Sequence, residues 1–443
     1  MTVYWCELAW LGGDVAEAGV VVGVEGERIT SVRAGVEAMP EGAIRLGGLT
    51  LPGFANAHSH GFQRALRGHA EDGPGSFWTW RQRMYELAGR LDPERYFRLA
   101  RATFAEMALA GVTAVGEFHY LHHQPSGTPY GDPNEIGKAM IAAAAEAGIR
   151  ITLLDACYQH GGIGEPLGEV QRRFADRDAD AWVERVAALD EGPGARVGAA
   201  IHSVRAVDPG AAARVAGWAL EHDRPLHAHV SEQPAENEAC RAAYGVTPTG
   251  LLEQAGALAA DFTAVHAIHL EPEDVLALGS SRACCCLCPT TERDLADGVG
   301  PAAGLQAAGA SLALGSDSHA VIDLLEEARA VELDERLVSG ERGSNRTPDL
   351  LAAATWAGHH SLGWPDAGVI EPGARADLTT VRLDGVRLAG TTSENALDAV
   401  VFAATASDVD HVVCGGREIV AGGKHLELDV AAELADAIAV LMR

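Results

Sequence analysis

Eight short apolar runs alternate with Ala-rich stretches through the middle of the chain, and this alternation carries most of the fold prediction. The runs occupy residues 51–58, 112–119, 151–156, 197–202, 226–229, 262–266, 283–288 and 311–317. The stretches between them have helical composition, as in 134–148, where strong helix formers are followed by a terminal glycine. Eight alternating strands and helices are typical of an α/β protein built as a (β/α)8 TIM-like barrel.

Almost every apolar run ends in His, Asp, Glu or Cys. In a parallel barrel the carboxyl ends of all strands open at one end, called here the mouth, and active sites lie there. The pattern therefore predicts a polar active site at the mouth. Residues 61–92, rich in aromatic side chains and arginine, follow the first run, and we expect them to form a lid or substrate loop.

Short strand patterns separated by turn residues mark both ends of the chain. They lie at 19–23, 28–33, 376–383, 399–403 and 411–420. We expect the two ends to share one β-rich domain, completed by a terminal helix. The predicted organisation is residues 1–50 for the N-terminal part of this domain, 51–365 for the barrel and 366–443 for the C-terminal part.

The composition is that of a globular protein with a strongly acidic charge. Of 443 residues, 47% are hydrophobic and 22% charged, and no apolar run reaches the roughly 18 residues of a membrane span. The net charge of −28 argues against binding to nucleic acid or to an anionic membrane, which both need a basic surface. Residues 1–11 lack the basic and apolar regions of a secretory leader, so we expect a cytoplasmic protein. Four of the eight cysteines lie within 284–288, where we expect buried thiols on a core strand.

A set of histidines and one aspartate predicts a metal site at the mouth. His58 and His60 stand at i and i+2, so both side chains lie on one face of a strand. His229, His266 and Asp317 end three later runs, and a local hydrogen bond would explain any one of these side chains but not the set. Three neutral imidazoles and a carboxylate, from His58, His60, His229 and Asp317, suit one divalent ion, Zn²⁺ or Fe²⁺, with a position left for water.

The segment Leu51-Pro-Gly-Phe-Ala-Asn-Ala-His-Ser-His resembles the first barrel strand of the amidohydrolase superfamily, and the resemblance extends over nearly the whole chain. It includes 371–378, which looks like the family's return into a small β-sandwich domain built from both chain ends. Dinuclear members bridge two metals with a carboxylated lysine at a strand end, whereas the two lysines here, Lys138 and Lys424, lie elsewhere. The resemblance thus implies one metal ion and the deaminase-like branch, in which Glu232, three residues after His229, is the proton shuttle.

These groups suit the addition of water to a C=N carbon, followed by protonation of the departing nitrogen. Glu232 would be the acid and base. His266 would take a proton from the activated water or stabilise the developing charge, and Asp317 would share that proton. The alternative for Glu232 is a hydrogen-bonding partner of the ligands or a solvated loop acid.

Further motifs narrow the resemblance to the formimidoylglutamate deiminases, which convert N-formimino-L-glutamate and water into N-formyl-L-glutamate and ammonia in histidine degradation. They lie at 61–68, 77–81, 117–123, 201–205, 288–292 and 315–319. The residues that the resemblance implies for binding a small dicarboxylate substrate are Gln63, Arg81, Tyr120, His202 and Arg205. Two carboxylates need forked cationic donors, which Arg81 and Arg205 would supply, with Arg83 as an alternative to Arg81.

Two other functions stay open at this point. The same metal chemistry would serve a guanine-like, cytosine-like or triazine-like ring amine, although a neutral ring has little use for two arginines. A non-catalytic scaffold that acts through oligomer surfaces would not need the polar groups at the mouth. The resemblance and the frequency of two-fold dimers lead us to expect a homodimer.

Overall fold

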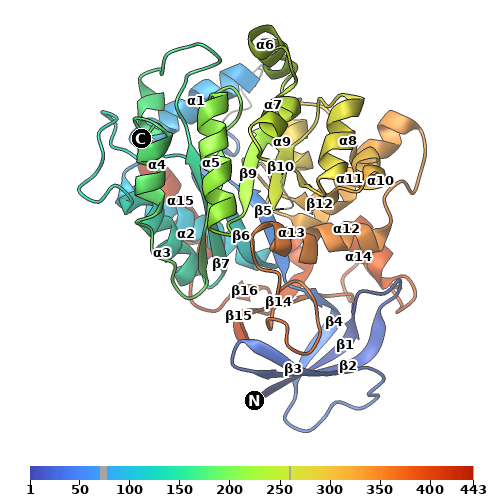
Figure 1. The fold of residues 1–443 in the computed structure, drawn as a ribbon. Coiled ribbons are helices and arrows are strands. Elements are labelled where there is room, and N and C mark those ends of the chain that lie inside the picture. Colours follow the sequence, from blue (N-terminus) through green and yellow to red (C-terminus); the bar gives the residue numbers. More distant parts are fainter. Residues whose placement is uncertain (70–76, 259–260, 443) are drawn as a thin grey trace.

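The computed structural model describes residues 1–69, 77–258 and 261–442, and it contains an eight-stranded parallel barrel and a smaller mixed sheet. In Figure 1 the barrel and its helices fill the upper part, and the small sheet lies below them. The prediction of a TIM-like barrel with a β-sandwich-like domain made from both chain ends is confirmed. Among the described residues, no helix is long and apolar enough to cross a membrane.

The barrel strands coincide with the eight apolar runs. They are β5 (Phe54–Ser59), β6 (Val112–His119), β7 (Arg150–Cys157), β8 (Ala195–Ile201), β9 (Leu226–Val230), β10 (Phe262–His266), β11 (Cys284–Leu287) and β12 (Ser311–Leu314). Each strand pairs in parallel with the next. A parallel bridge between Ser59 and Asp317 joins the first strand to the residues after the last, and so closes the barrel.

Helices follow the strands and cover the outside of the barrel (Figure 1). They are α2 (Pro93–Leu109), α3 (Glu135–Ala147), α4 (Ala179–Val186), α5 (Pro209–Glu221), α6 (Pro234–Tyr244), α7 (Pro248–Gln254), α8 (Pro272–Ser280), α9 (Pro289–Asp294), α10 (Ala302–Ala308), α11 (Leu324–Ser339), α12 (Thr347–Ala354) and α13 (Trp356–Ser361). Many begin with proline, whose missing N–H costs nothing in the first turn of a helix. The predicted helix at 134–148 is confirmed, since α3 ends at Gly148 with a φ of 81°.

The described part of the segment 61–92 is mostly helical, so the loop conformation predicted there was wrong. It contains the 3₁₀ helix η1 (Gly61–Leu66) and the helix α1 (Phe77–Arg90), while 70–76 lie outside the described residues. Met84, Leu87 and Ala88 are buried at the spacing of one helical face. The prediction rested on the aromatic side chains and arginines of this segment, and three of them, Phe77, Trp80 and Arg81, line the pocket described below. Movement of the segment as a lid stays a prediction.

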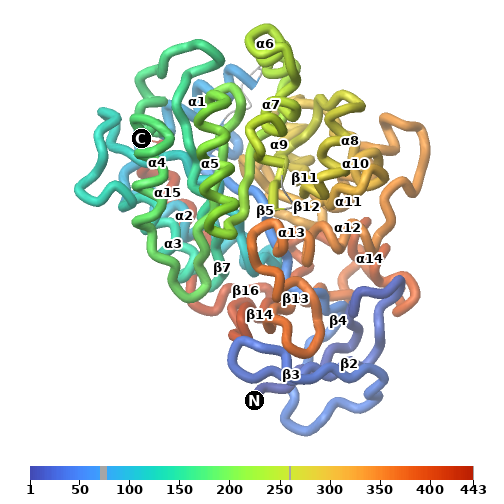
Figure 2. The backbone as a smooth tube through the Cα atoms, in the orientation of Figure 1, coloured from blue at the N-terminus to red at the C-terminus, as the bar shows by residue number. Residues whose placement is uncertain are grey.

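Both chain ends contribute to the small sheet, as the blue and red segments in the lower part of Figure 2 show. Its strands are β1 (Thr2–Ala9), β2 (Glu17–Glu25), β3 (Arg28–Arg33), β4 (Ile44–Pro52), β13 (Leu378–Val381), β14 (Val409–Cys414), β15 (Arg417–Ala421) and β16 (Lys424–His425). The order is β16-β15-β14-β13-β4-β1-β2-β3, so β13 joins the two ends by pairing antiparallel with β4. Since β4 runs through Pro52, this sheet extends two residues beyond position 50.

One predicted strand of the C-terminal part was wrong. Residues 399–403 belong to the helix α14 (Ala396–Ala403), in which Leu397, Val400 and Val401 are buried. These three residues stand at positions i, i+3 and i+4, which lie on one face of a helix. The prediction considered only the short apolar run at 399–403 and so missed this spacing. The terminal helix α15 (Val430–Leu441) lies against α2, where Arg101 on α2 pairs with Glu433 at 2.9 Å.

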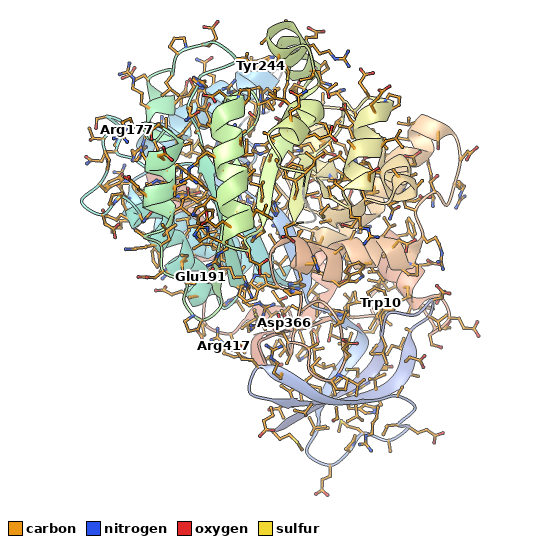
Figure 3. All side chains as sticks on the ribbon, viewed as in Figure 1. Trp10, Arg177, Glu191, Tyr244, Asp366 and Arg417 are labelled. Atoms are coloured by element: carbon orange, nitrogen blue, oxygen red, sulfur yellow. The ribbon has the colours of Figure 1, made fainter. Side chains whose placement is uncertain are left out.

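Buried and exposed ion pairs connect the barrel to the small sheet. Arg150, the first residue of β7, forms a two-fold hydrogen-bonded pair with Asp377, just before β13, and both side chains are almost fully buried. The Asp377 carboxylate also accepts from the Gly415 N–H at 2.8 Å. At the same junction, Asp366 pairs with Arg28 of β3 at 2.6 Å (Figure 3).

We expect Arg150→Met to lower the free energy of unfolding by about 3 to 5 kcal/mol, because it leaves the Asp377 carboxylate buried without its cation. Urea unfolding followed by circular dichroism measures the change. As a control, Lys138→Met breaks an exposed pair with Asp132 and should leave the stability near that of the wild type. A loss no larger in Arg150→Met than in this control would contradict the prediction.

Candidate active site

Closure of the barrel brings the predicted metal ligands together. The His60 N–H donates to the Asp317 carbonyl at 3.1 Å, and the Asp317 N–H donates to the His58 carbonyl at 3.0 Å. These backbone bonds place the end of β5 beside the segment after β12. His229, at the end of β9, reaches the same point from the other side of the barrel, with its Nε2 3.2 Å from His58 Nε2.

The donor atoms stand at the spacing that one metal ion requires. His58 Nε2 and His60 Nε2 lie 3.2 and 3.4 Å from Asp317 Oδ1. Four ligands at about 2.1 Å from a tetrahedral ion are roughly 3.4 Å apart. The residues present therefore fit the predicted ligand set of His58, His60, His229 and Asp317.

Hydrogen bonds behind the histidines leave Nε2 free to bind a metal. His60 Nδ1 contacts the Phe118 carbonyl oxygen at 2.9 Å, and His229 Nδ1 contacts the His202 carbonyl oxygen at 2.7 Å. A carbonyl oxygen only accepts, so in both rings Nδ1 carries the proton and Nε2 the lone pair. Burial lowers the pKa of His60 to about 4 and that of His229 well below its usual value, which keeps both rings neutral.

A buried glutamate, Glu117, forms hydrogen bonds to the end of the first barrel strand, β5. The Glu117 carboxylate accepts from Ser59 Oγ at 2.6 Å, from the Gly61 N–H at 2.8 Å and from the Tyr96 hydroxyl at 3.1 Å. Burial raises the pKa of Glu117 to about 7, although these donors oppose the shift. Ser59 separates His58 and His60, so Glu117 holds the backbone that carries these two predicted ligands.

His266 lies beside the metal ligands within a group of carboxylates. Its Nε2 is 3.9 Å from both Glu232 Oε1 and Asp317 Oδ2, and its Nδ1 is 3.3 Å from Glu292 Oε1. Burial lowers the pKa of His266, but the Glu292 hydrogen bond and the nearby charges of Glu232 and Asp317 outweigh it and raise the pKa to about 10. Both His266 and Asp317 have positive φ values, 69° and 42°, which non-glycine residues adopt only where the surroundings impose them.

The predicted proton shuttle is paired with a predicted substrate arginine. Glu232 Oε2 accepts from Arg205 Nη2 at 2.7 Å. Burial alone would raise the pKa of Glu232, but the Arg205 guanidinium holds it below its usual value. Arg205 Nη1 is buried and has no hydrogen-bond partner among the described residues. Arg205 therefore contacts the predicted shuttle directly and has a second donor that no described residue satisfies.

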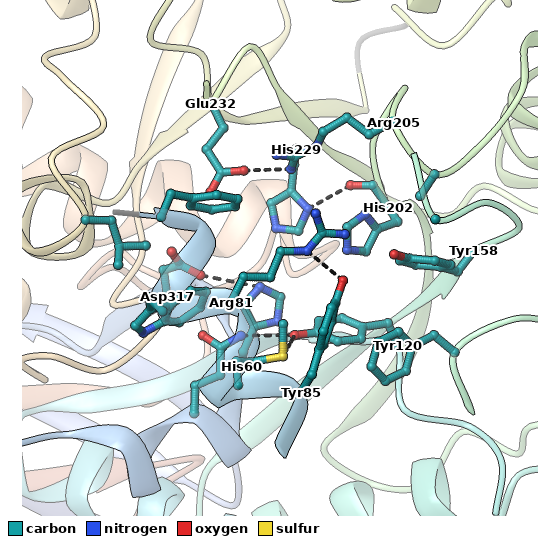
Figure 4. Close-up of a pocket in the computed structure, with 18 residues that line it drawn as sticks. His60, Arg81, Tyr85, Tyr120, Tyr158, His202, Arg205, His229, Glu232 and Asp317 are labelled. Carbon is teal, nitrogen blue, oxygen red and sulfur yellow. Dashed lines mark hydrogen bonds and ion pairs between the residues drawn. The ribbon is translucent and has the colours of Figure 1, made fainter. Parts of the chain in front are cut away.

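The five predicted substrate residues line one pocket next to the metal ligands (Figure 4). Gln63 Nε2 donates to the Tyr120 hydroxyl at 3.0 Å, and Gln63 Oε1 is buried without a partner in the part of the chain that the structure describes. His202 packs edge-on against Tyr120, and burial together with the charges of Arg205 and Arg81 lowers its pKa well below the usual value.

The choice between Arg81 and Arg83 follows from their positions on α1. Arg81 points into the pocket, whereas Arg83 donates to the carbonyl oxygen of His69 and is not among the pocket residues. In a helix, positions 81 and 83 face in nearly opposite directions.

Sequence reasoning missed several residues of this site. Tyr85 and Tyr158 also line the pocket, and Glu292 contacts His266. The spacing of Tyr85 four positions after Arg81 was an available signal, because both lie on one helical face. Nothing in the sequence alone places Tyr158 beside them.

The cysteine-rich strand contributes no ligand to this arrangement. All eight cysteines are buried and free, as expected for thiols in a core. Cys284 and Cys286 face the barrel interior with Val265 and Ala313, whereas Cys285 joins the larger core outside. Lys138 on α3 and Lys424 on β16 are both exposed, so neither is a bridging ligand.

The chain belongs to the amidohydrolase family, whose model matches residues 49–419. The family consists of metal-dependent hydrolases, and the resemblance inferred from the first strand is confirmed.

Individual relatives and solved structures show which kinds of protein this chain resembles. The chain is 39% identical over 403 residues to a formimidoylglutamate deiminase of Pseudomonas aeruginosa, covering 88% of each protein. The crystal structure of an amidohydrolase from Brucella melitensis superimposes with a TM-score of 0.92 at 34% identity, covering 100% of both chains. An adenosine deaminase from Xanthomonas campestris with bound zinc has a TM-score of 0.86 at 23% identity, over 99% of this chain and 97% of its own, and shows the shared fold.

We expect His229→Asn to lose most of the metal that the wild type holds after dialysis, because it removes one of the four ligands. Inductively coupled plasma mass spectrometry measures the metal content per chain. The matched control is His227→Asn, two residues earlier on β9, since His227 bonds to the Ser361 carbonyl oxygen and not to the ligand set. Equal metal content in His229→Asn and the wild type would exclude His229 as a ligand.

Proposed function

We propose that this protein hydrolyses N-formimino-L-glutamate to N-formyl-L-glutamate and ammonia, and that its metal ion is Zn²⁺. The observation that carries the proposal is the pair of arginines in the pocket. In a chain with a net charge of −28, Arg81 and Arg205 line one small cavity next to the metal ligands. A dicarboxylate is the substrate class that would use both guanidiniums.

Two unmet hydrogen-bonding atoms in the pocket support the same substrate. Arg205 Nη1 is a buried donor and Gln63 Oε1 a buried acceptor, and neither has a partner within residues 1–69, 77–258 and 261–442. Buried polar atoms without partners are costly, so a ligand that satisfies them gains affinity. N-Formimino-L-glutamate offers carboxylate oxygens to the first and N–H groups to the second.

The reaction adds water to the formimino carbon and releases its terminal nitrogen as ammonia. A bound divalent ion would activate water and polarise the C=N bond. Glu232 takes one proton from the attacking water at its carboxylate and gives it to the formimino nitrogen. The remaining proton of the new hydroxyl group then passes through the same carboxylate to that nitrogen, which leaves as ammonia, so both hydrogens of the water end on the product and Glu232 is regenerated. His266 is held protonated by its three carboxylate neighbours and stabilises the negative charge that develops beside it.

Arg205 has two roles in this proposal. It binds a substrate carboxylate through Nη1 and orients Glu232 through Nη2, so it contributes to turnover as well as to binding. Asp317 serves both as a metal ligand and as a neighbour of His266. The homodimer and the cytoplasmic location stay predictions.

The direct test is ammonia release by protein of known metal content, assayed with N-formimino-L-glutamate, N-formimino-glycine, guanine and cytosine. We expect release from the dicarboxylate at a kcat/KM at least about tenfold above that of N-formimino-glycine, which lacks one carboxylate, and at least about a hundredfold above those of the ring amines, which lack both. Each charge-assisted pair contributes about 1.5 to 3 kcal/mol. Release from a ring amine alone would retain the metal chemistry and reject the substrate. No release from metal-loaded protein would favour a scaffold.

We expect Glu232→Gln to reduce kcat by roughly two to four orders of magnitude, because the amide cannot carry the proton. Its metal content should stay near that of the wild type, since Glu232 is not in the ligand set. Steady-state kinetics and metal analysis are measured on the same preparation. Glu238→Gln, an exposed residue on α6, is the matched control, and equal kcat values in the two variants would remove Glu232 from the mechanism.

A further inference from the structure

Arg81 is positioned by the helix α1, whereas Arg205 lies in the turn that follows the barrel strand β8. Within α1 it is oriented by Tyr85, one turn further along. Arg81 Nε donates to the Tyr85 hydroxyl at 2.6 Å, and its guanidinium carbon lies 5.2 Å from the centre of the Tyr85 ring (Figure 4). Because α1 is not part of the barrel, the position of the Tyr85 hydroxyl relative to the barrel mouth depends on a contact with another element.

Gln171 provides that connection. Its Nε2 donates to the Tyr85 hydroxyl at 3.0 Å and to the Tyr158 hydroxyl at 2.7 Å. Its Oε1 accepts from the Gly168 N–H at 2.8 Å. Gln171 belongs to the 3₁₀ helix η2 (Val170–Arg173) and is 6% exposed. It lies behind the two tyrosines and is not among the side chains that line the pocket.

The two tyrosines that Gln171 joins face the pocket from different elements. Tyr85 comes from α1, and Tyr158 follows β7, with its ring 4.5 Å from that of His202. A buried amide is costly unless its polar atoms are satisfied. Here the Gln171 amide is satisfied largely by the hydroxyl groups of two pocket residues, which indicates a role in the geometry of the pocket.

Arg173, on the same 3₁₀ helix, holds the far end of α1. Its Nη2 donates to the Leu91 carbonyl oxygen at 2.8 Å, its Nη1 to the Ala88 carbonyl oxygen, and its Nε to the His123 carbonyl oxygen at 3.0 Å. The 3₁₀ helix η2 therefore attaches α1 to the barrel at two points. Arg173 fixes the backbone of the helix, and Gln171 fixes the side chain that orients Arg81.

We propose that Gln171 is a positioning residue that, through the Tyr85 hydroxyl, holds the Arg81 guanidinium where it receives one carboxylate of the substrate. The proposal rests on the proposed function, since it assigns a substrate carboxylate to Arg81. It does not involve the metal ligands, Glu232 or His266, which Gln171 does not contact. Gln171 consequently affects substrate binding and leaves the chemical step unchanged.

The test is Gln171→Met, which keeps the length of the side chain and removes its hydrogen bonds. We expect KM for N-formimino-L-glutamate to rise about tenfold, the effect of losing one well-placed polar contact, with kcat within about twofold of the wild type. An unchanged KM would overturn the proposal. Gln124→Met, an amide on a neighbouring loop that bonds to Pro129, is the matched control and should leave KM unchanged.

A double-mutant cycle separates positioning from a general structural effect. In an Arg81→Met background, Gln171→Met should change KM by less than about twofold, because the group that it positions is gone. The same tenfold rise in both backgrounds, or a loss of kcat, would mean that Gln171 acts through the fold and would overturn the proposal. If Gln171→Met does not fold, Tyr85→Phe replaces it in the same cycle, since it removes the hydroxyl that links Gln171 to Arg81.

The ammonia assay on the wild type tests the proposed function before any variant is made. If the wild type releases no ammonia from N-formimino-L-glutamate, the substrate assignment is rejected. The proposed role of Gln171 is then rejected as well, because it depends on that assignment. If the wild type is active and the cycle is additive, the substrate assignment stands and only the role of Gln171 is rejected.

Discussion

Closure of the barrel between β5 and β12 is the constraint on which the active site depends. The backbone hydrogen bonds that join His58 and His60 to Asp317 are part of this closure, so the fold itself sets the spacing of three of the predicted metal ligands. Behind them, Asn56 donates to Ser316 Oγ at 2.7 Å and accepts from the Ser316 N–H at 2.9 Å, which fixes the segment that leads into Asp317. The positive φ of Asp317 is tolerated because these contacts determine its conformation from both sides.

The second constraint is electrostatic. Glu232, Asp317 and Glu292 all face His266, and burial would make three such carboxylates costly without cations. His266 and Arg205 supply positive charge within the protein, and the predicted metal ion would add more. This balance explains why a chain with a net charge of −28 places a buried histidine, His266, and a largely buried arginine, Arg205, at the mouth of its barrel.

The sequence predicts the barrel well because its signals are local. Each strand is a short apolar run, and the polar residue at its end lies at the mouth through the topology alone. This is why the sequence could predict which histidines and which aspartate lie close together there. Residues 399–403 were misjudged because a short apolar run does not reveal its period. The helix α1 was taken for part of a loop because the prediction relied on the aromatic and arginine content of 61–92 and not on the helical spacing of its apolar residues. The contacts of Gln171 with Tyr85 and Tyr158 could not be predicted, since they join three segments through tertiary packing.

Under the proposed function, Arg205 links substrate selection to the proton shuttle. Its Nη2 is already bound to Glu232, so Nη1 is the donor that remains for a substrate carboxylate. A neutral ring amine would fill the pocket and leave Nη1 buried without a partner, and a site built around a polar contact rejects an analogue that lacks it far more strongly than an apolar pocket does. The preference for a carboxylate therefore arises as much from the penalty on the alternative as from the attraction of the correct substrate. Because the same guanidinium orients Glu232, the group that selects the substrate also holds the acid that acts on it.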